Sequence, residues 1–469
     1  MQSPTGIAAA RRRTVTMDHV WVAVAMAVPV IGVLAGAMSS IDLAYQIRAG
    51  EWMLRTHRLL DVDTFTFTAA GTHWLNQQWG AQVLIALIHR AGRFGALSVT
   101  RGALTFLGFG GVYLACREAG ASLRRAALLS LAAFGLSLYH LAMRPQMFGV
   151  ALFGLALWVV EGRRRRPGLL WASIHGSFVL GPLLGGLAWL EDRRDRLPVA
   201  RTTLTVTVVA GMASLVNPFG LRVWTYAIGI GTNPTIRNLI SEWRPTTART
   251  AAGAAFLASV AILAVYFARR ERQVPWLVLL RLGIFFVLGL PAIRGVLWWG
   301  MATPVIAAEL LPPSGGREPR VGVPAMNVAI VVAVCLAVVV AAPRGSQTVL
   351  GTPILEDAPA GLSATAQEEL PTGSRLFNSQ LWGSWFELTD PTMQVFVDSL
   401  IEVTSATVWN DYFRASSAQD GWQGILDRWR VDAAVLSPEQ AASLIQSMLV
   451  DPGWRVLRHD TDGYLFVRR

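Results

Sequence analysis

The sequence predicts an all-α bundle of about 10–12 membrane helices, followed by a small α/β domain at the C-terminus. Apolar residues make up 53% of the 469-residue chain and charged residues only 15%, a balance that is unusually apolar for a soluble protein. The apolar residues fall into blocks of nearly membrane-spanning length. From residue 372 onward the pattern changes to short β-rich runs that alternate with helical stretches.

Four apolar blocks are examples with a length near the roughly 20 residues that a helix needs to cross a bilayer. They are His19–Met38, Gly95–Cys116, Ala251–Ala268 and Pro324–Ala342. The first block follows Arg11–Arg13, a pattern that signal peptides and signal anchors share. Because no small-residue cleavage site precedes a soluble chain, we expect an anchor that remains as the first span. Five other blocks are further candidate spans: Ala126–Met143, Gln146–Val160, Thr202–Val216, Val274–Leu290 and Ile293–Leu311.

The distribution of charge predicts the orientation. The net charge is +11, but residues 344–469 hold 9 Arg against 16 Asp and Glu, a net −7, so the preceding residues carry +18. Arginines crowded into short loops between spans follow the positive-inside rule and do not indicate nucleic acid as a partner. We therefore expect cytoplasmic ends at Arg11–Arg13 and Arg163–Arg166. The C-terminal domain then lies outside the plasma (inner) membrane.

Three segments fit this topology less simply. Trp79–Ile88 is too short to cross and is interpreted as an interfacial helix. Gly168–Leu190 lies between two arginine clusters, so we expect it to form a hairpin that turns near His175, although its first half is too short to span. Asn217–Thr250 is predicted to be a long outer loop.

The tail is predicted to be one small domain, 372–469, joined to the membrane part, 1–342, by a linker at 343–371. Expected strands are Ser374–Asn378, Gln394–Asp398, Asp432–Leu436, Trp454–His459 and Tyr464–Arg468. Expected helices are Val408–Arg414, Trp422–Trp429 and Pro438–Leu449. This alternation of short strands and helices is typical of an α/β domain.

Polar residues of chemical interest gather on the outer side in this topology. The first outer loop, 39–78, supplies Asp42, Asp63, Asn76 and Gln78, and other outer ends supply Arg144, His175, Glu242, Arg244 and Arg294. Any one of these could simply be a solvated anchor at the membrane boundary. As a set on one face, they predict a binding cleft.

The layout resembles the GT-C superfamily of membrane glycosyltransferases, and it is more closely similar to a group of uncharacterised bacterial multi-span proteins of that architecture. The matching stretches are Asp42–Trp52, Asp63–Trp79, Arg144–Phe148, His175–Gly181, Asn217–Trp224, Thr232–Pro245, Phe377–Asn378 and Asp451–Trp454. The resemblance implies transfer of a sugar from a polyprenyl-phosphate carrier to a glycan, lipid or protein acceptor outside the cytoplasm, with membrane lipids around the spans.

The resemblance also implies roles for individual residues. Asp42 matches the outer-loop catalytic Asp and would act as general base in an inverting displacement. Asp63 would be a second carboxylate that orients the acceptor or holds a divalent metal, although the chain has no His/Cys cluster with metal-ligand spacing. The guanidinium groups of Arg144, Arg244 and Arg294 are candidates to grip the phosphate, and His175 could add a hydrogen bond. The remaining substrate-binding candidates are Asn76, Gln78 and Glu242.

The chain departs from the wider family at three positions. Gln46 stands where many members have His, and Gln77–Gln78 stand where they have His-Glu. Amides cannot transfer protons and favour hydrogen bonding to hydroxyl groups instead.

Two other classes of function stay open at this stage. A non-catalytic membrane protein could use the same cleft to bind a lipid-linked glycan or to scaffold a cell-envelope complex. A transporter should show charged or broken helices near mid-membrane, often in paired repeats. Arg281 is one such charge, but the sequence shows no partner or repeat for it.

Overall fold

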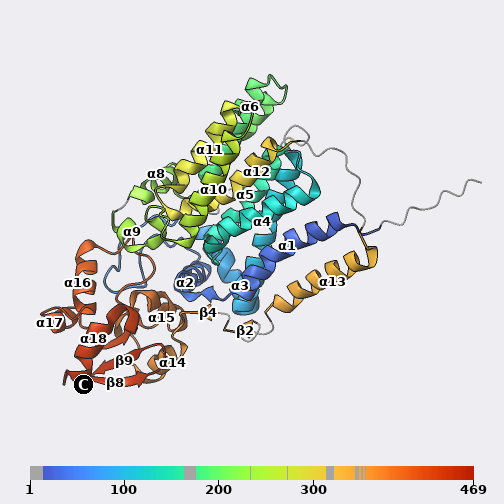
Figure 1. Ribbon diagram of the computed structural model, residues 1–469. Coiled ribbons are helices and arrows are strands. Elements are labelled where there is room, and N and C mark those ends of the chain that lie inside the picture. Colours follow the sequence, from blue (N-terminus) through green and yellow to red (C-terminus); the bar gives the residue numbers. More distant parts are fainter. Residues whose placement is uncertain are drawn as a thin grey trace, which may run out of the picture.

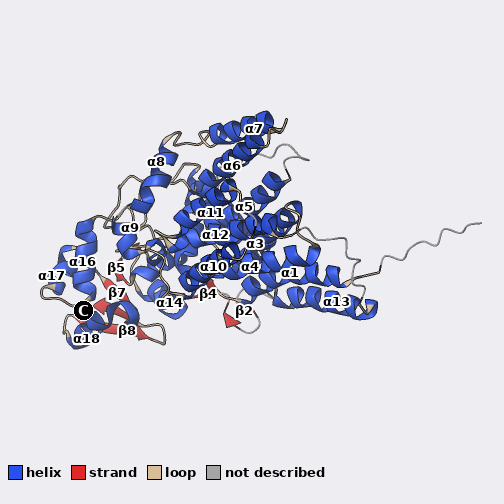
Figure 2. Ribbon diagram, turned by 45° about the horizontal axis from the view of Figure 1, so that its top comes forward, coloured by secondary structure: helices blue, strands red, loops and turns tan. Residues whose placement is uncertain are grey.

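The computed structural model describes residues 14–162, 176–232, 234–271, 273–312, 322–343, 348–349, 352–353 and 355–469. It shows a helical bundle joined to a C-terminal domain that contains a five-stranded sheet (Figure 1). The predicted fold class, a bundle of apolar helices followed by a small α/β domain, is confirmed. Strands are confined to the C-terminal domain and its approach, apart from a two-residue strand that precedes α2 (Figure 2).

The bundle contains helices of two lengths. Four described helices are long and apolar enough to cross a membrane: α1 Met17–Ala35, α3 Trp79–Glu118, α10 Ala251–Ala268 and α13 Pro324–Ala341. Shorter helices pack among them: α4 Leu123–Ser137, α5 Pro145–Glu161, α6 Leu180–Arg194, α7 Ala200–Ala213, α11 Trp276–Gly289 and α12 Val296–Leu310. Each corresponds to a predicted span or to part of one.

The structure differs in how it agrees with the predictions for the three segments that fitted the topology poorly. Trp79–Ile88 is the first part of α3, which is kinked where Gly92 and Arg93 leave helical backbone angles, so a short helix does precede the span. The predicted hairpin turn, with His175, lies outside the described residues. The predicted outer loop contains two short helices, α8 Arg222–Gly229 and α9 Pro234–Leu239.

Close packing of α3 against α5 forms the centre of the bundle. A Cβ atom built on Gly154 of α5 would lie 2.0 Å from the carbonyl oxygen of Gly108 in α3, and one on Gly111 would lie 2.3 Å from the Gly154 carbonyl carbon. Only glycine permits this backbone approach. Small residues of this kind are how membrane helices gain van der Waals contact without a hydrophobic driving force between them.

Arg281 of α11 has partners that its sequence position did not reveal. Its guanidinium is bound to the carboxylate of Glu309 in α12 and lies 3.5 Å from Glu161 at the end of α5. All three side chains are largely buried. The charge of Arg281 therefore joins three helices, α5, α11 and α12, through largely buried ion pairs.

The C-terminal sheet has the strand order β6-β5-β7-β9-β8. Its strands are β5 Arg375–Asn378, β6 Gln394–Val395, β7 Ala433–Leu436, β8 Trp454–His459 and β9 Tyr464–Arg468. The first three strands pair in parallel, and β9 pairs antiparallel with both of its neighbours. All five predicted strands are confirmed, β8 and β9 residue for residue and the other three in shortened form.

Helices cover both faces of this sheet. Alternation along β5 sends Phe377 into the core beneath α16 Ala406–Ser416, α17 Trp422–Arg428 and α18 Pro438–Val450, and sends Leu376 toward α14 Ala360–Glu369 and α15 Gly383–Thr389. Successive strand residues point to opposite faces, so a sheet buried on both sides needs apolar residues at consecutive positions. The sequence Ala433–Leu436 meets that need.

The predicted linker, 343–371, is in part folded. Its residues 360–369 form α14, which packs on β8 and β9. Leu362 and Ala366 are completely buried there, and Ser363 accepts a hydrogen bond from the Trp385 indole at 3.1 Å. The weak apolar periodicity of the segment concealed this helix, because alanine and serine fill its buried face.

The C-terminal domain docks on α2 Ser40–Thr56, the helix that follows the first span. Figure 1 shows α2 between the bundle and this domain. Ala44 of α2 belongs to the same apolar cluster as α14 and α15, and β1 Met38–Ser39 pairs in parallel with β4 Leu355–Glu356. The segment 39–78 and the tail therefore lie at the same end of the bundle.

A buried pair of carboxyl groups lies at this docking surface. Glu387 of α15 and Asp398 are 2% and 1% exposed and lie close enough to hydrogen bond to each other. No hydrogen bond from other described residues reaches either oxygen of Glu387. Because ionised carboxylates only accept hydrogen bonds and two of them buried together repel, we expect the pair to share a proton. Burial raises the pKa of Glu387, and it also raises the pKa of Asp398 to about 8.

We expect Gly154→Ala to destabilise the bundle, because the added methyl group would force α3 and α5 apart. Gly135→Ala in α4 is the matched control, since a Cβ there meets nothing within 4 Å. Thermal unfolding in nanodiscs can be followed by tryptophan fluorescence. The midpoint temperature of Gly154→Ala should be lower than that of the wild type, whereas the midpoint of Gly135→Ala should be unchanged. Equal midpoints for the two variants would contradict the close packing described here.

Raising the pH from 6 to 9 should loosen the C-terminal domain. Both carboxyl pKa values are raised in the folded state, so the stabilisation is complete below roughly pH 4 and is lost as the pH rises through about 8. The thermal midpoint should fall between pH 6 and 9, and Glu387→Gln should flatten that fall, because its amide donates in place of the proton. Glu368→Gln, an exposed change on α14, should leave the wild-type pH profile. If the thermal midpoint of Glu387→Gln falls between pH 6 and 9 as steeply as that of the wild type, the two carboxyl groups do not share a proton.

Candidate functional site

A cavity of about 300 Å³ lies where α2, one end of the bundle and the C-terminal domain meet. Its lining comes from four regions of the sequence. The first outer loop and α2 contribute 41–46 and 74–82, the bundle contributes 144–146 and Arg294, and the tail contributes 380–381 and 399–402. The remaining wall is built from the segment between Tyr226 and Trp243.

Helix α2 brings Asp42 to the cavity. The helix begins at Ser40, so Asp42 lies in its first turn, where a carboxylate is stabilised by the free backbone N–H groups. Asp42, Tyr45 and Gln46 follow helical spacing and therefore share the face that lines the cavity. Gly50, one turn later, lets α2 lie directly against α3, since a Cβ there would be 2.1 Å from the Gln82 carbonyl oxygen.

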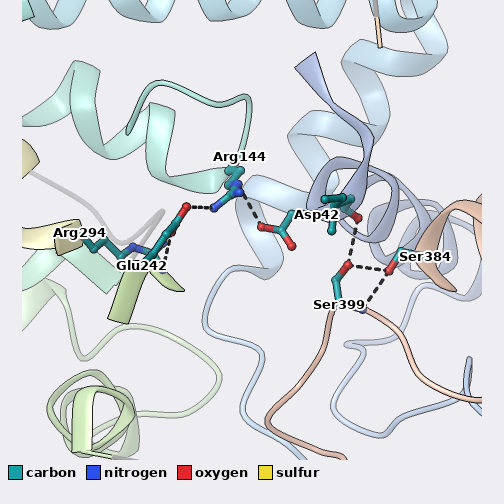
Figure 3. A network of polar contacts seen from close by, with 7 residues as sticks. Asp42, Arg144, Glu242, Arg294, Ser384 and Ser399 are labelled. Carbon is teal, nitrogen blue, oxygen red and sulfur yellow. Dashed lines mark hydrogen bonds and ion pairs between the residues drawn. The ribbon is translucent and has the colours of Figure 1, made fainter. Parts of the chain in front are cut away.

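A chain of alternating charges crosses the cavity wall (Figure 3). Arg144 lies between two carboxylates, with Nε 3.0 Å from Asp42 Oδ2 and Nη1 2.6 Å from Glu242 Oε1. Arg294 follows, with Nη1 4.0 Å from Glu242 Oε2, and its guanidinium lies 5.5 Å from the ring centroid of Trp243. Arg144 precedes Pro145, the first residue of α5, and so is held at the start of that helix.

The electrostatic balance favours the ionised form of Glu242. Burial alone would raise its pKa, but the guanidinium groups of Arg144 and Arg294 outweigh burial, and the pKa of Glu242 lies below its ordinary value. The three side chains remain between about a quarter and a third exposed toward the cavity. Two arginines face two carboxylates, Glu242 and Asp42, so the charges of the site balance. An anion that enters must compete with these carboxylates for the guanidinium groups.

The C-terminal domain closes the opposite side of the cavity. Ser399 donates a hydrogen bond from its hydroxyl to the Ile41 carbonyl oxygen at 3.0 Å, directly before Asp42, and it contacts Ser384 at 3.0 Å (Figure 3). Glu402 accepts a hydrogen bond from the Tyr226 hydroxyl at 2.5 Å. Burial raises the pKa of Glu402, although the bond from Tyr226 acts in the other direction.

The structure brings five of the nine predicted site residues to one cavity: Asp42, Gln78, Arg144, Glu242 and Arg294 all line it. Asn76 is buried behind the wall, where its amide donates to Gln82 at 2.7 Å. His175 lies outside the described residues.

Two predicted residues lie elsewhere. The Asp63 carboxylate accepts hydrogen bonds from the Thr66 hydroxyl at 2.5 Å and the Phe65 N–H at 2.9 Å, so it stabilises a turn of the outer loop and does not line the cavity. Arg244 is exposed, and its guanidinium donates to the Asn238 carbonyl at 3.1 Å. Its backbone is extended where the Glu242 helical turn ends, which directs the side chain away from the cavity.

Sequence reasoning missed the contribution of the tail. Ser399, Glu402 and Gln380 line the cavity, yet they stand in segments without a recognisable motif. The only signal in the sequence was the prediction that the tail lies on the outer side. Among the described residues, no group of three or more His, Cys, Asp or Glu side chains is arranged to hold a metal ion.

No family model matches the chain, and no curated protein matches it. Among solved structures, the apo form of the oligosaccharyltransferase of Archaeoglobus fulgidus is similar to it, with a TM-score of 0.45 and 13% sequence identity. The alignment covers 92% of this chain and 71% of the archaeal chain. A likeness at this level carries no conclusion about activity or substrate, so the chemistry rests on the cavity itself.

Proposed function

We propose that this protein is a GT-C-type membrane glycosyltransferase that moves a sugar from a polyprenyl-phosphate donor to an acceptor outside the cytoplasm. One observation carries the proposal. The Asp42 carboxylate lines a cavity open to solvent and is bound to a guanidinium group, Arg144, with a second guanidinium, Arg294, nearby. A carboxylate and two guanidinium groups are what transfer from a phosphate leaving group to a hydroxyl requires.

The arginines would hold the donor phosphate. Without a ligand, the Arg144 guanidinium is shared between Asp42 and Glu242. A phosphate group offers more charge and a better geometric match to a guanidinium than one carboxylate does. Donor binding would therefore draw Arg144 and Arg294 to the phosphate and release Asp42 from its ion pair.

The released Asp42 would then act as general base. It takes the proton from an acceptor hydroxyl while that oxygen attacks the anomeric carbon from the face opposite the phosphate. One carbon–oxygen bond forms, the bond from the anomeric carbon to the phosphate oxygen breaks, and its electron pair leaves with the polyprenyl phosphate. The configuration at the anomeric carbon inverts. The arginines stabilise the charge that develops on the leaving group.

We expect Asp42→Asn to lower transfer by a factor of about 10²–10⁴, because the amide cannot accept the proton. The measurement is the cell-envelope glycan profile of a deletion strain complemented with each variant, at equal protein abundance. Asp420→Asn, an exposed change in the C-terminal domain, is the matched control and should restore the wild-type profile. If Asp42→Asn also restores it fully, the cavity binds or scaffolds without catalysis, which is the alternative function.

The same proposal requires the cavity to lie on the outer side of the membrane. In a Cys335→Ser background, which removes the exposed native thiol, a cysteine introduced at Gln423 would be exposed on the C-terminal domain. An impermeant maleimide should label it in intact spheroplasts. Labelling only after the cytoplasmic side is opened would reverse the orientation and remove the donor phosphate from reach of an outer acceptor.

A further inference from the structure

The cavity is lined by an unusual concentration of glutamine. The chain contains 15 glutamines, and six of them line this one cavity: Gln46, Gln77, Gln78, Gln82, Gln146 and Gln380. They come from α2, the end of the outer loop, α3, α5 and the C-terminal domain. Five separate segments thus bring a glutamine side chain to the cavity. The charged side chains of the lining are Glu402 and the ion-paired residues Asp42, Arg144, Glu242 and Arg294.

Several polar atoms of the lining residues have no hydrogen-bond partner among the described residues. The amide oxygens of Gln46 and Gln77 are buried without a donor, and the Tyr45 hydroxyl and the Trp74 indole N–H are buried without an acceptor. Leaving such a group unpaired is unfavourable, because it loses its hydrogen bonds to water and gains none in exchange. Four of them around one cavity indicate a ligand that supplies both donors and acceptors, reached by small movements of the side chains.

The chemistry of the lining limits the class of ligand. An amide offers a donor and an acceptor side by side, which matches a hydroxyl group, itself both donor and acceptor. An ammonium ligand would need a free carboxylate, but Asp42 and Glu242 are bound to Arg144. Glu402 is bound to a phenol, Tyr226, and burial favours its neutral form. The tyrosine and tryptophan rings of the lining add faces on which an apolar sugar face can stack.

We infer that the acceptor half of this cavity binds a neutral, hydroxyl-rich ligand, a saccharide, rather than an amine or an acidic sugar. The preference for a neutral saccharide would be determined by Gln46, Gln77 and the Tyr226–Glu402 pair. The inference rests on the proposed function, because it names the acceptor class of that site. The size of the cavity, about 300 Å³, is at the lower end of the range for small-molecule sites and suits a sugar unit at the end of a glycan.

Saturation-transfer NMR on the full-length protein in nanodiscs tests the inference. The probes are the methyl glycosides of glucose, galactose and mannose, with methyl glucuronoside as the acidic probe and glucosamine methyl glycoside as the amine probe. At least one neutral glycoside should receive saturation from the protein. The double variant Gln46→Leu/Gln77→Leu should reduce that transfer at least tenfold, whereas Gln446→Leu, the same change at an exposed position on α18, should not alter it.

The outcomes separate this inference from the proposed function. Asp42→Asn should keep glycoside binding, because it removes the base and leaves the glutamines in place. If the wild type and Asp42→Asn both bind a neutral glycoside and the glycan profile of Asp42→Asn is unaltered, the proposed catalysis is wrong but the saccharide site remains. Three results would overturn the saccharide inference. No neutral glycoside receives saturation, the acidic or amine probe receives more than the neutral ones, or a folded Gln46→Leu/Gln77→Leu variant still binds the neutral glycoside as well as the wild type does.

Discussion

The Arg144 guanidinium is the contact on which the site depends. It joins three segments that the sequence keeps far apart, because it lies at the start of α5, binds Asp42 of α2 and binds Glu242 of the outer segment. Removing one partner from a partly buried ion pair leaves the other charge without compensation. The same three charges that hold these segments together are the ones a phosphate ligand would rearrange, so the stability of the outer face and its chemistry are coupled.

The C-terminal domain is part of the site rather than an appendage. It packs on α2 through an apolar cluster that includes Ala44, and its Ser399 hydroxyl holds the Ile41 carbonyl immediately before Asp42. The buried Glu387–Asp398 pair lies at the same surface, where we expect a shared proton to relieve the repulsion between two carboxylates. The position of the proposed base is therefore set from both sides, by the bundle and by the soluble domain.

Local pattern was sufficient where apolar or β-forming residues are frequent along an element. Ala251–Ala268 coincides with α10 to the residue, and Trp454–His459 and Tyr464–Arg468 coincide with β8 and β9. Local sequence pattern failed to predict structure where the burial of a side chain depends on a partner far away in the sequence. The residues of α14 are mostly small and polar, and they form a helix because Leu362 and Ala366 meet the sheet. Arg281 looked isolated for the same reason, since Glu309 reaches it only when α11 and α12 pack side by side.

The sequence alone determined that this is a membrane protein with a soluble tail, because apolar blocks and arginine-rich loops are local features with one low-energy arrangement in a bilayer. It also identified Asp42, Arg144, Glu242 and Arg294 as members of one face. Only the tertiary structure decided which of the candidates share a cavity. Asp63 is occupied by its own turn and Arg244 points away, while the tail contributes Ser399 and Glu402. Those outcomes depend on how side chains from distant segments are oriented by packing, which no local sequence pattern encodes.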